Sequence, residues 1–194
     1  FNQPIGDWNV SSSTKLYHMF FEAQSFDQSL AQWDVSLVTD MREMFNAAVG
    51  LSDSNKGEIH KSFSSNSNWP YDWSEFVTYA PITDANFQDA VNLWFSDEAN
   101  ATHTYGHIRD WNVSAVTDMS EAFMDRSTFN EDISGWDVGN VTKMTRLFKG
   151  ASSFNQPIGD WDMSSVRWMG SMFFDASNFN QPIGDWDTSA VTNM

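Results

Sequence analysis

The chain has 194 residues, of which 26 are acidic and 10 are basic, so its formal net charge is −16 at pH 7. This charge disfavours binding to nucleic acid and to anionic lipid surfaces, and it favours cations or basic partners. The absence of cysteine excludes disulfides and thiolate metal sites. No run of 18 apolar residues is present, so no membrane span is expected.

A tryptophan recurs every 25 residues through most of the chain. Trp8 and Trp33 are separated by this interval, and so are Trp111, Trp136, Trp161 and Trp186. A fixed period of this size is typical of repeat proteins, in which neighbouring units bury one another's apolar faces. Because the apolar residues include 16 Phe, 10 Trp and 10 Met, aromatic stacking between repeats is expected to hold the structure together.

Each repeat is expected to contain a short strand followed by a short helix. Apolar and polar residues alternate from position 161 to 164, as in a half-buried strand. Apolar residues then follow at the spacing i, i+3, i+4 and i+7, which is one face of a helix, at Met169, Met172, Phe173 and Ala176. The pattern predicts an α/β repeat solenoid with leucine-rich-repeat-like coils, in which the tryptophans face the core rather than a bound sugar.

The repeat pattern is interrupted in the middle of the chain. We expect a repeat array at residues 1–50, a polar insertion or linker at residues 51–81, a capping helix within residues 82–103, and a second array at residues 104–194. The alternative is one continuous solenoid that carries a large insertion. The aromatic residues at 69–73 are expected to dock onto an array.

Two phrases of the repeat resemble a known family. Residues 154–161 read Phe-Asn-Gln-Pro-Ile-Gly-Asp-Trp, and residues 111–119 read Trp-Asn-Val-Ser-Ala-Val-Thr-Asp-Met. Both phrases resemble the BspA-like surface-protein repeat, which was first collected among mycoplasma lipoprotein-associated proteins of unknown function. The resemblance implies a leucine-rich-repeat-like fold on a secreted or surface-displayed protein, often linked to adhesion or matrix binding. It implies no catalytic activity.

Carboxylates flank the tryptophans of the later repeats. Asp160 and Asp162 lie on either side of Trp161, and Asp185 and Asp187 repeat this arrangement. Stacking of the repeats is expected to bring these side chains together, and clustered oxygen ligands suit Ca²⁺. Calcium is therefore the one cofactor that the sequence suggests. The alternative is that the carboxylates cap turns or remain in solvent.

Four Asn-x-Ser/Thr triplets predict N-glycosylation, at Asn9, Asn100, Asn112 and Asn140. Three of them follow from the repeat pattern itself. Asn100 lies outside the repeats, in a segment expected to be a loop, so it is the independent indication of secretion.

Other residue pairs give weaker signals of chemistry. His103 and His107 are spaced as two metal ligands on a helix would be, but no third ligand lies nearby in the sequence. Asp84 and Asp89 form the kind of carboxylate pair that a glycan-cleaving enzyme uses, although any acidic chain supplies such pairs. No nucleophile or phosphate-binding motif is present, and we expect the chain not to be an enzyme.

These observations predict an extracellular or cell-surface repeat protein that acts in adhesion, matrix or filament assembly through a regular acidic surface. Protein or glycan surface partners are expected, and also end-to-end self-association. The chain opens and closes within a repeat, so further segments, including any signal or anchor, are expected outside it. The first alternative is a receptor-like module that binds through the insertion beside the array. A calcium-dependent, ice-binding or mineral-binding surface is another alternative, although no flat Thr-x-Thr ladder is present.

Overall fold

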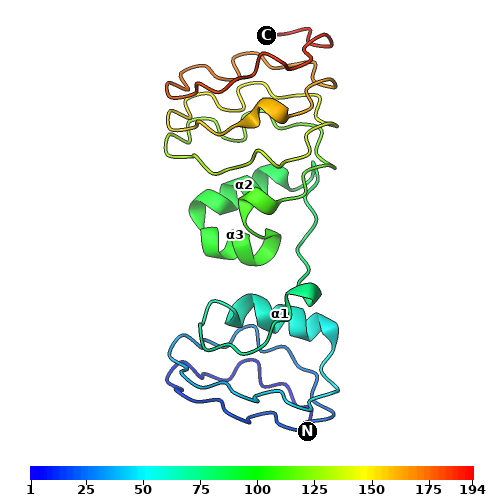
Figure 1. Ribbon diagram of the computed structural model, residues 1–194, viewed down its shortest axis with the longest axis vertical. Coiled ribbons are helices and arrows are strands. Elements are labelled where there is room, and N and C mark those ends of the chain that lie inside the picture. The colour runs from blue at the N-terminus through cyan, green and yellow to red at the C-terminus, as the bar shows by residue number, and fades with distance from the viewer. The chain divides into compact units, whose positions relative to one another are not determined.

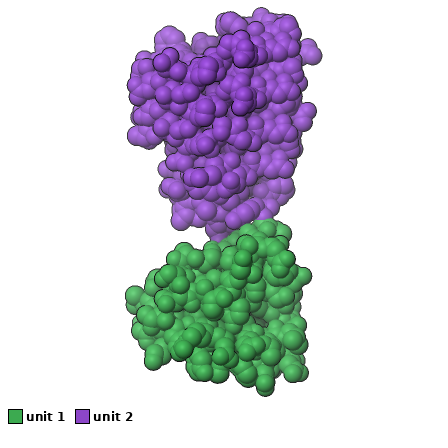
Figure 2. All heavy atoms as spheres, in the orientation of Figure 1, with its two compact units in different colours: residues 1–78 green, residues 79–194 purple.

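The chain forms two compact units. The computed structural model describes residues 1–194 and divides them into unit 1, residues 1–78, and unit 2, residues 79–194 (Figure 2). Each unit has an apolar core of its own. The helices of unit 1 are α1 (Asp53–Phe63) and the 3-10 helix η1 (Ser74–Phe76) (Figure 1). The helices of unit 2 are α2 (Phe87–Ser96), α3 (Glu98–Tyr105) and the 3-10 helices η2 (Ile108–Asp110) and η3 (Ile158–Asp160).

The expected α/β repeat solenoid with leucine-rich-repeat-like coils is wrong. The repeats contain neither a β-sheet nor an α-helix, and all three α-helices lie within residues 53–105. Each repeat contains several turns joined by segments without regular secondary structure. Isolated parallel bridges, such as those of Lys143 with Asp118 and Trp168, link one repeat to the next.

Backbone conformation explains why the helical spacing of apolar residues does not produce a helix. In the segment that contains Met169 to Ala176, Ser171 has φ 58° and Asp175 has φ 60°. Each of these residues is the third of a turn, because Met172 N–H donates to Met169 O and Ala176 N–H donates to Phe173 O. A positive φ at that position is the mark of a type II turn and breaks a right-handed helix. All of the remaining repeats also have positive φ angles at the two equivalent positions.

Backbone hydrogen bonds between repeats satisfy the N–H groups that a helix would have paired internally. In unit 2 the N–H groups of Met144 and Phe148 donate to the carbonyls of Trp168 and Met172, at 2.7 and 2.9 Å. We call the donors of these bonds, each 24 residues before its acceptor, the inter-repeat ladder. Its members are Leu16, His18, Phe20 and Glu22 in unit 1, and Met119, Glu121, Phe123, Asp125, Met144, Arg146, Phe148, Gly150 and Met169 in unit 2.

Phenylalanine rings of successive repeats stack on one another in register. The ring centroids of Phe123 and Phe148 are 5.5 Å apart, and those of Phe148 and Phe173 are 5.6 Å apart. A second column joins Phe129, Phe154 and Phe179 at 5.7 and 5.9 Å. Stacking at these separations adds to the free energy gained by burying the rings.

The tryptophans complete the core. Trp136 and Trp186 are 4% and 8% exposed, and their Nε1 atoms donate to the carbonyls of Ile108 and Ile158 at 2.9 and 3.1 Å. The prediction that the tryptophans face the core is confirmed for Trp33, Trp111, Trp136, Trp161 and Trp186. Trp8 is the exception, with 53% of its surface exposed.

In unit 1, the side chains of residues 69–73 replace the contacts that a further repeat would make. The N–H group of Phe45, one period after the ladder donor Phe20, donates to the Tyr71 hydroxyl at 2.8 Å. The Trp69 and Trp73 rings lie 6.2 and 5.4 Å from the Phe45 ring, where another repeat would supply a phenylalanine. The prediction that these aromatic residues dock onto the repeats is confirmed.

Helix α1 occupies a segment that the sequence suggested was a polar loop. The Ser52 side chain accepts a hydrogen bond from Asn55 N–H and caps the helix. Ile59 and Phe63 are fully buried in the core of unit 1 and anchor the helix. In unit 2, α2 and α3 replace the single capping helix expected within residues 82–103, and Phe87 and Trp94 of α2 join the core of the repeats.

The turn conformation gives a first testable prediction. Gly150 has φ 70°, and a Cβ at this position would meet the Asp125 carboxylate. Gly150→Ala should therefore lower the free energy of unfolding by about 1 kcal/mol, measured by urea denaturation. Gly184 has open space around its Cα, so Gly184→Ala is the control, and an equal loss in both variants would contradict the explanation.

Candidate functional site

Asp84 caps the repeats of unit 2. Its carboxylate accepts hydrogen bonds from Thr117 N–H at 2.7 Å, from Thr117 Oγ1 at 2.6 Å and from Asp118 N–H at 3.2 Å. One period later, the same three groups of Thr142 and Lys143 donate to the carbonyl of Thr117. The Asp84 carboxylate therefore replaces the carbonyl of a preceding repeat. This structural role differs from that of the acid or base in the Asp84 and Asp89 pair considered above.

The capping bonds make the contribution of Asp84 dependent on pH. Hydrogen bonds from the Thr117 side chain and backbone hold the pKa of Asp84 below its ordinary value of 3.8. A lowered pKa in the folded state means that the contribution is complete above pH 3.8 and is lost as the pH falls through the folded-state pKa.

Substitution of Asp84 tests this role. Asp84→Ala should lower the free energy of unfolding by about 1 kcal/mol at pH 7, and the difference from the unaltered chain should shrink in acid. Asp89→Ala removes an exposed carboxylate from the first turn of α2 and should cost less, about 0.5 kcal/mol. Denaturation at pH 7 and at pH 2.5 measures both, and a loss of equal size at the two pH values would contradict the account.

The structure does not gather the four carboxylates that the sequence suggested for calcium. Asp160 and Asp185 line an open groove of about 220 Å³ together with Pro157, Gly159 and Pro182. Asp162 and Asp187 do not line this groove, and no group of three or more His, Asp or Glu side chains is placed to hold a metal ion. Calcium binding is a prediction that only an experiment can test.

Asp162 and Asp187 cap turns instead. Their Oδ1 atoms accept hydrogen bonds from Ser164 N–H at 3.0 Å and Ser189 N–H at 2.9 Å. The side chains and then the backbone N–H groups of these serines lower the pKa of both carboxyls. Asp187 repels Asp162 electrostatically, and a Cβ on Gly139 would lie 3.4 Å from oxygens of both Asp137 and Asp162. We call Asp137, Asp162 and Asp187, all exposed, the acidic column.

A thermal melt distinguishes turn caps from a calcium site. Because the carboxylates of Asp162 and Asp187 already accept hydrogen bonds, we expect the Tm in millimolar calcium to lie within about 1 °C of the Tm in EDTA. Magnesium at the same concentration controls for ionic strength. A rise of several degrees specific to calcium would show that a calcium site exists and that the caps are not the main role.

All four sequon asparagines are exposed. Asn9 and Asn112 cap turns through Oδ1, which accepts from Ser11 and Ser114. The Asn140 Nδ2 atom donates to the Ser114 carbonyl at 2.9 Å. Asn100 lies in α3 rather than in the expected loop. Glycosylation of these residues is still a prediction.

The two histidines do not lie on one helix. His103 lies in the last turn of α3, whereas His107 follows the helix and its Nδ1 atom accepts from Arg109 N–H at 3.3 Å. The Trp94 ring packs against the His107 ring with centroids 4.9 Å apart. Packing and capping thus account for His107.

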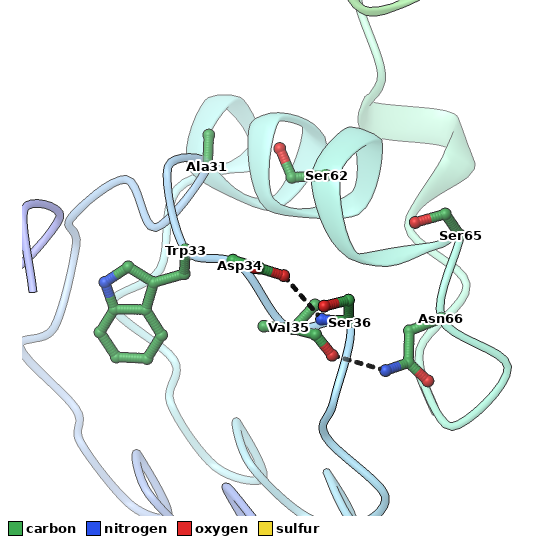
Figure 3. A pocket seen from close by; sticks show the side chains of 8 residues that line it. All are labelled: Ala31, Trp33, Asp34, Val35, Ser36, Ser62, Ser65 and Asn66. Carbon is green, nitrogen blue, oxygen red and sulfur yellow. Dashed lines mark hydrogen bonds between the residues drawn. The ribbon is translucent and has the colours of Figure 1, made fainter. Parts of the chain in front are cut away.

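A pocket of about 410 Å³ opens in unit 1 (Figure 3). One wall comes from the second repeat and the other from α1 and the residues that follow it. We call it the α1 pocket, and its lining is Ala31, Trp33, Asp34, Val35, Ser36, Ser62, Ser65 and Asn66. Sequence reasoning missed this site, because its two walls lie about one repeat apart in the chain and the second wall was expected to be a loop.

The fold and its surfaces define a protein of stacked, turn-rich repeats held by backbone ladders and aromatic columns. The chain matches the family described as "Mycoplasma protein of unknown function, DUF285" at residues 1–77 and 88–194, and it belongs to that family. No curated protein and no solved structure matches the chain. None of its helices combines the length and apolar character needed to cross a membrane.

Proposed function

We propose that this chain is a non-enzymatic, extracellular or cell-surface repeat protein that acts in adhesion or assembly through its acidic surface. The acidic column is the observation that carries the proposal. Its carboxylates recur every 25 residues and are held in place by turn hydrogen bonds. A fixed row of like charges can engage a basic partner at several points at once, which multiplies weak contacts.

Two further observations support this proposal. The net charge of −16 favours basic partners. The resemblance of the repeat to BspA-like surface proteins, a finer assignment than the family match, supports display at the cell surface. End-to-end association of copies is a second form of assembly that such repeats could use.

Charge removal within the acidic column tests the proposal. Asp137→Asn, Asp162→Asn and Asp187→Asn together keep the oxygen that caps each turn, and Asn112 already occupies the equivalent position one repeat earlier. We expect beads coated with this triple variant to adhere about tenfold less to a surface carrying a lysine-rich peptide. Thermal melts should show that the variant remains folded.

A matched variant separates the arrangement of charges from their number. Asp53→Asn, Asp89→Asn and Glu98→Gln remove the same charge from exposed helical positions outside the acidic column. This variant should retain most of the adhesion. Equal loss in both variants would mean that net charge alone attracts the peptide, and the proposed role of the column would be withdrawn.

A receptor-like module is the second candidate function, and the α1 pocket favours it. The pocket lies where the inserted segment meets the repeats, as a binding site formed beside the array would. Deleting the insertion would not test this function, because Ile59 and Phe63 belong to the core of unit 1. Point substitutions in the pocket wall are needed instead.

A further inference from the structure

We propose that the α1 pocket binds a neutral carbohydrate unit, which deepens the second candidate function given above. The volume of about 410 Å³ lies within the range of about 300–1,000 Å³ that is usual for small-molecule sites. Its walls combine serine hydroxyls and the Asp34 carboxylate with the apolar surface of Ala31. A sugar ring presents the same mixture of hydroxyl groups and C–H faces.

The polar groups of the pocket suit a ligand rich in hydroxyls. The Ser62 and Ser65 hydroxyls line the pocket and make no side-chain hydrogen bond within the chain. Each can donate one hydrogen bond and accept others. Asp34 uses Oδ1 to accept from Ser36 N–H at 3.0 Å (Figure 3), which leaves Oδ2 available to accept from a ligand hydroxyl.

Charge narrows the class of ligand. The Ser36 side chain and its backbone N–H lower the pKa of Asp34, so this carboxylate is ionised at neutral pH. No basic residue lines the pocket, so anionic ligands such as phosphates are disfavoured. Neutral sugars suit the mixture of one carboxylate with several uncharged polar groups better than a simple cation, which would leave the serine donors unused.

The repeat wall of the pocket is fixed before any ligand arrives. The Asn66 Nδ2 atom donates to the carbonyls of Val35 and Val38 at 2.7 and 2.9 Å. The Trp33 Nε1 atom donates to the Ile5 carbonyl at 3.0 Å. A preformed wall lowers the cost of ordering on binding, although the open shape predicts weak affinity.

The test uses the whole chain and a panel of neutral sugars. Glucose, galactose, mannose and N-acetylglucosamine are titrated up to about 20 mM, since a Kd near 1 mM is expected of a shallow site. Binding is followed by saturation-transfer NMR and by backbone amide shifts. We expect saturable binding of at least one sugar, with shift changes centred on residues 31–36 and 62–66.

Two variants locate the binding. Ser62→Ala with Ser65→Ala should weaken the binding at least tenfold, whereas Ser67→Ala, at an exposed position outside the lining, should leave it unchanged. Thermal melts should confirm that both variants fold.

The proposal is overturned if no sugar shows saturable binding, if the double variant binds as well as the unaltered chain, or if methylammonium binds the pocket in place of the sugars. The acidic column lies in unit 2, so loss of sugar binding leaves peptide adhesion intact and the two proposals fail separately.

Discussion

The backbone hydrogen bond from one repeat to the next is the constraint on which the rest of the structure depends. Type II turns place residues such as Ser171 in a left-handed conformation, so their segments cannot pair their N–H groups within a helix. The N–H groups reach the next repeat instead, and Phe148 does so at 2.9 Å. Because buried N–H groups need partners, a segment without a neighbouring repeat requires a substitute. Tyr71 and Asp84 supply that substitute with a hydroxyl and a carboxylate.

The sequence predicted the parts of the fold that depend on burial and missed those that depend on backbone angles. The 25-residue recurrence of tryptophan correctly indicated a buried column, because burial follows from the pattern of apolar residues alone. The predicted strand and helix failed because spacing does not reveal the sign of φ. Within the turns of the repeats, glycine marks a position of positive φ only at Gly150, whereas Glu43 and Ala47 adopt a positive φ without such a signal. Helix α1 was missed because its polar composition hides two anchoring residues, Ile59 and Phe63.

The candidate sites were likewise predicted only in part from the sequence. The sequence identified the recurring aspartates, but only the structure shows that Asp162 caps a turn while Asp160 lines a separate groove. Asp84 could have been suspected as a cap, since the Thr117 segment has no preceding repeat to supply a carbonyl. The α1 pocket could not have been found, because it forms only when α1 packs against the second repeat. The aromatic residues form the core, and we propose that the acidic column on the outer turns and the α1 pocket meet partners.

Native-state amide hydrogen exchange tests the central claim most directly. If the inter-repeat ladder holds each unit together, the amides of Phe123 and Phe148 should exchange only when unit 2 unfolds as a whole. The amide of Phe45, bonded to Tyr71, should be similarly protected in unit 1. The amide of Ser164, which donates only to a carboxylate within its own turn, should exchange much faster. Exchange of Phe123 and Phe148 as fast as Ser164 would contradict the account.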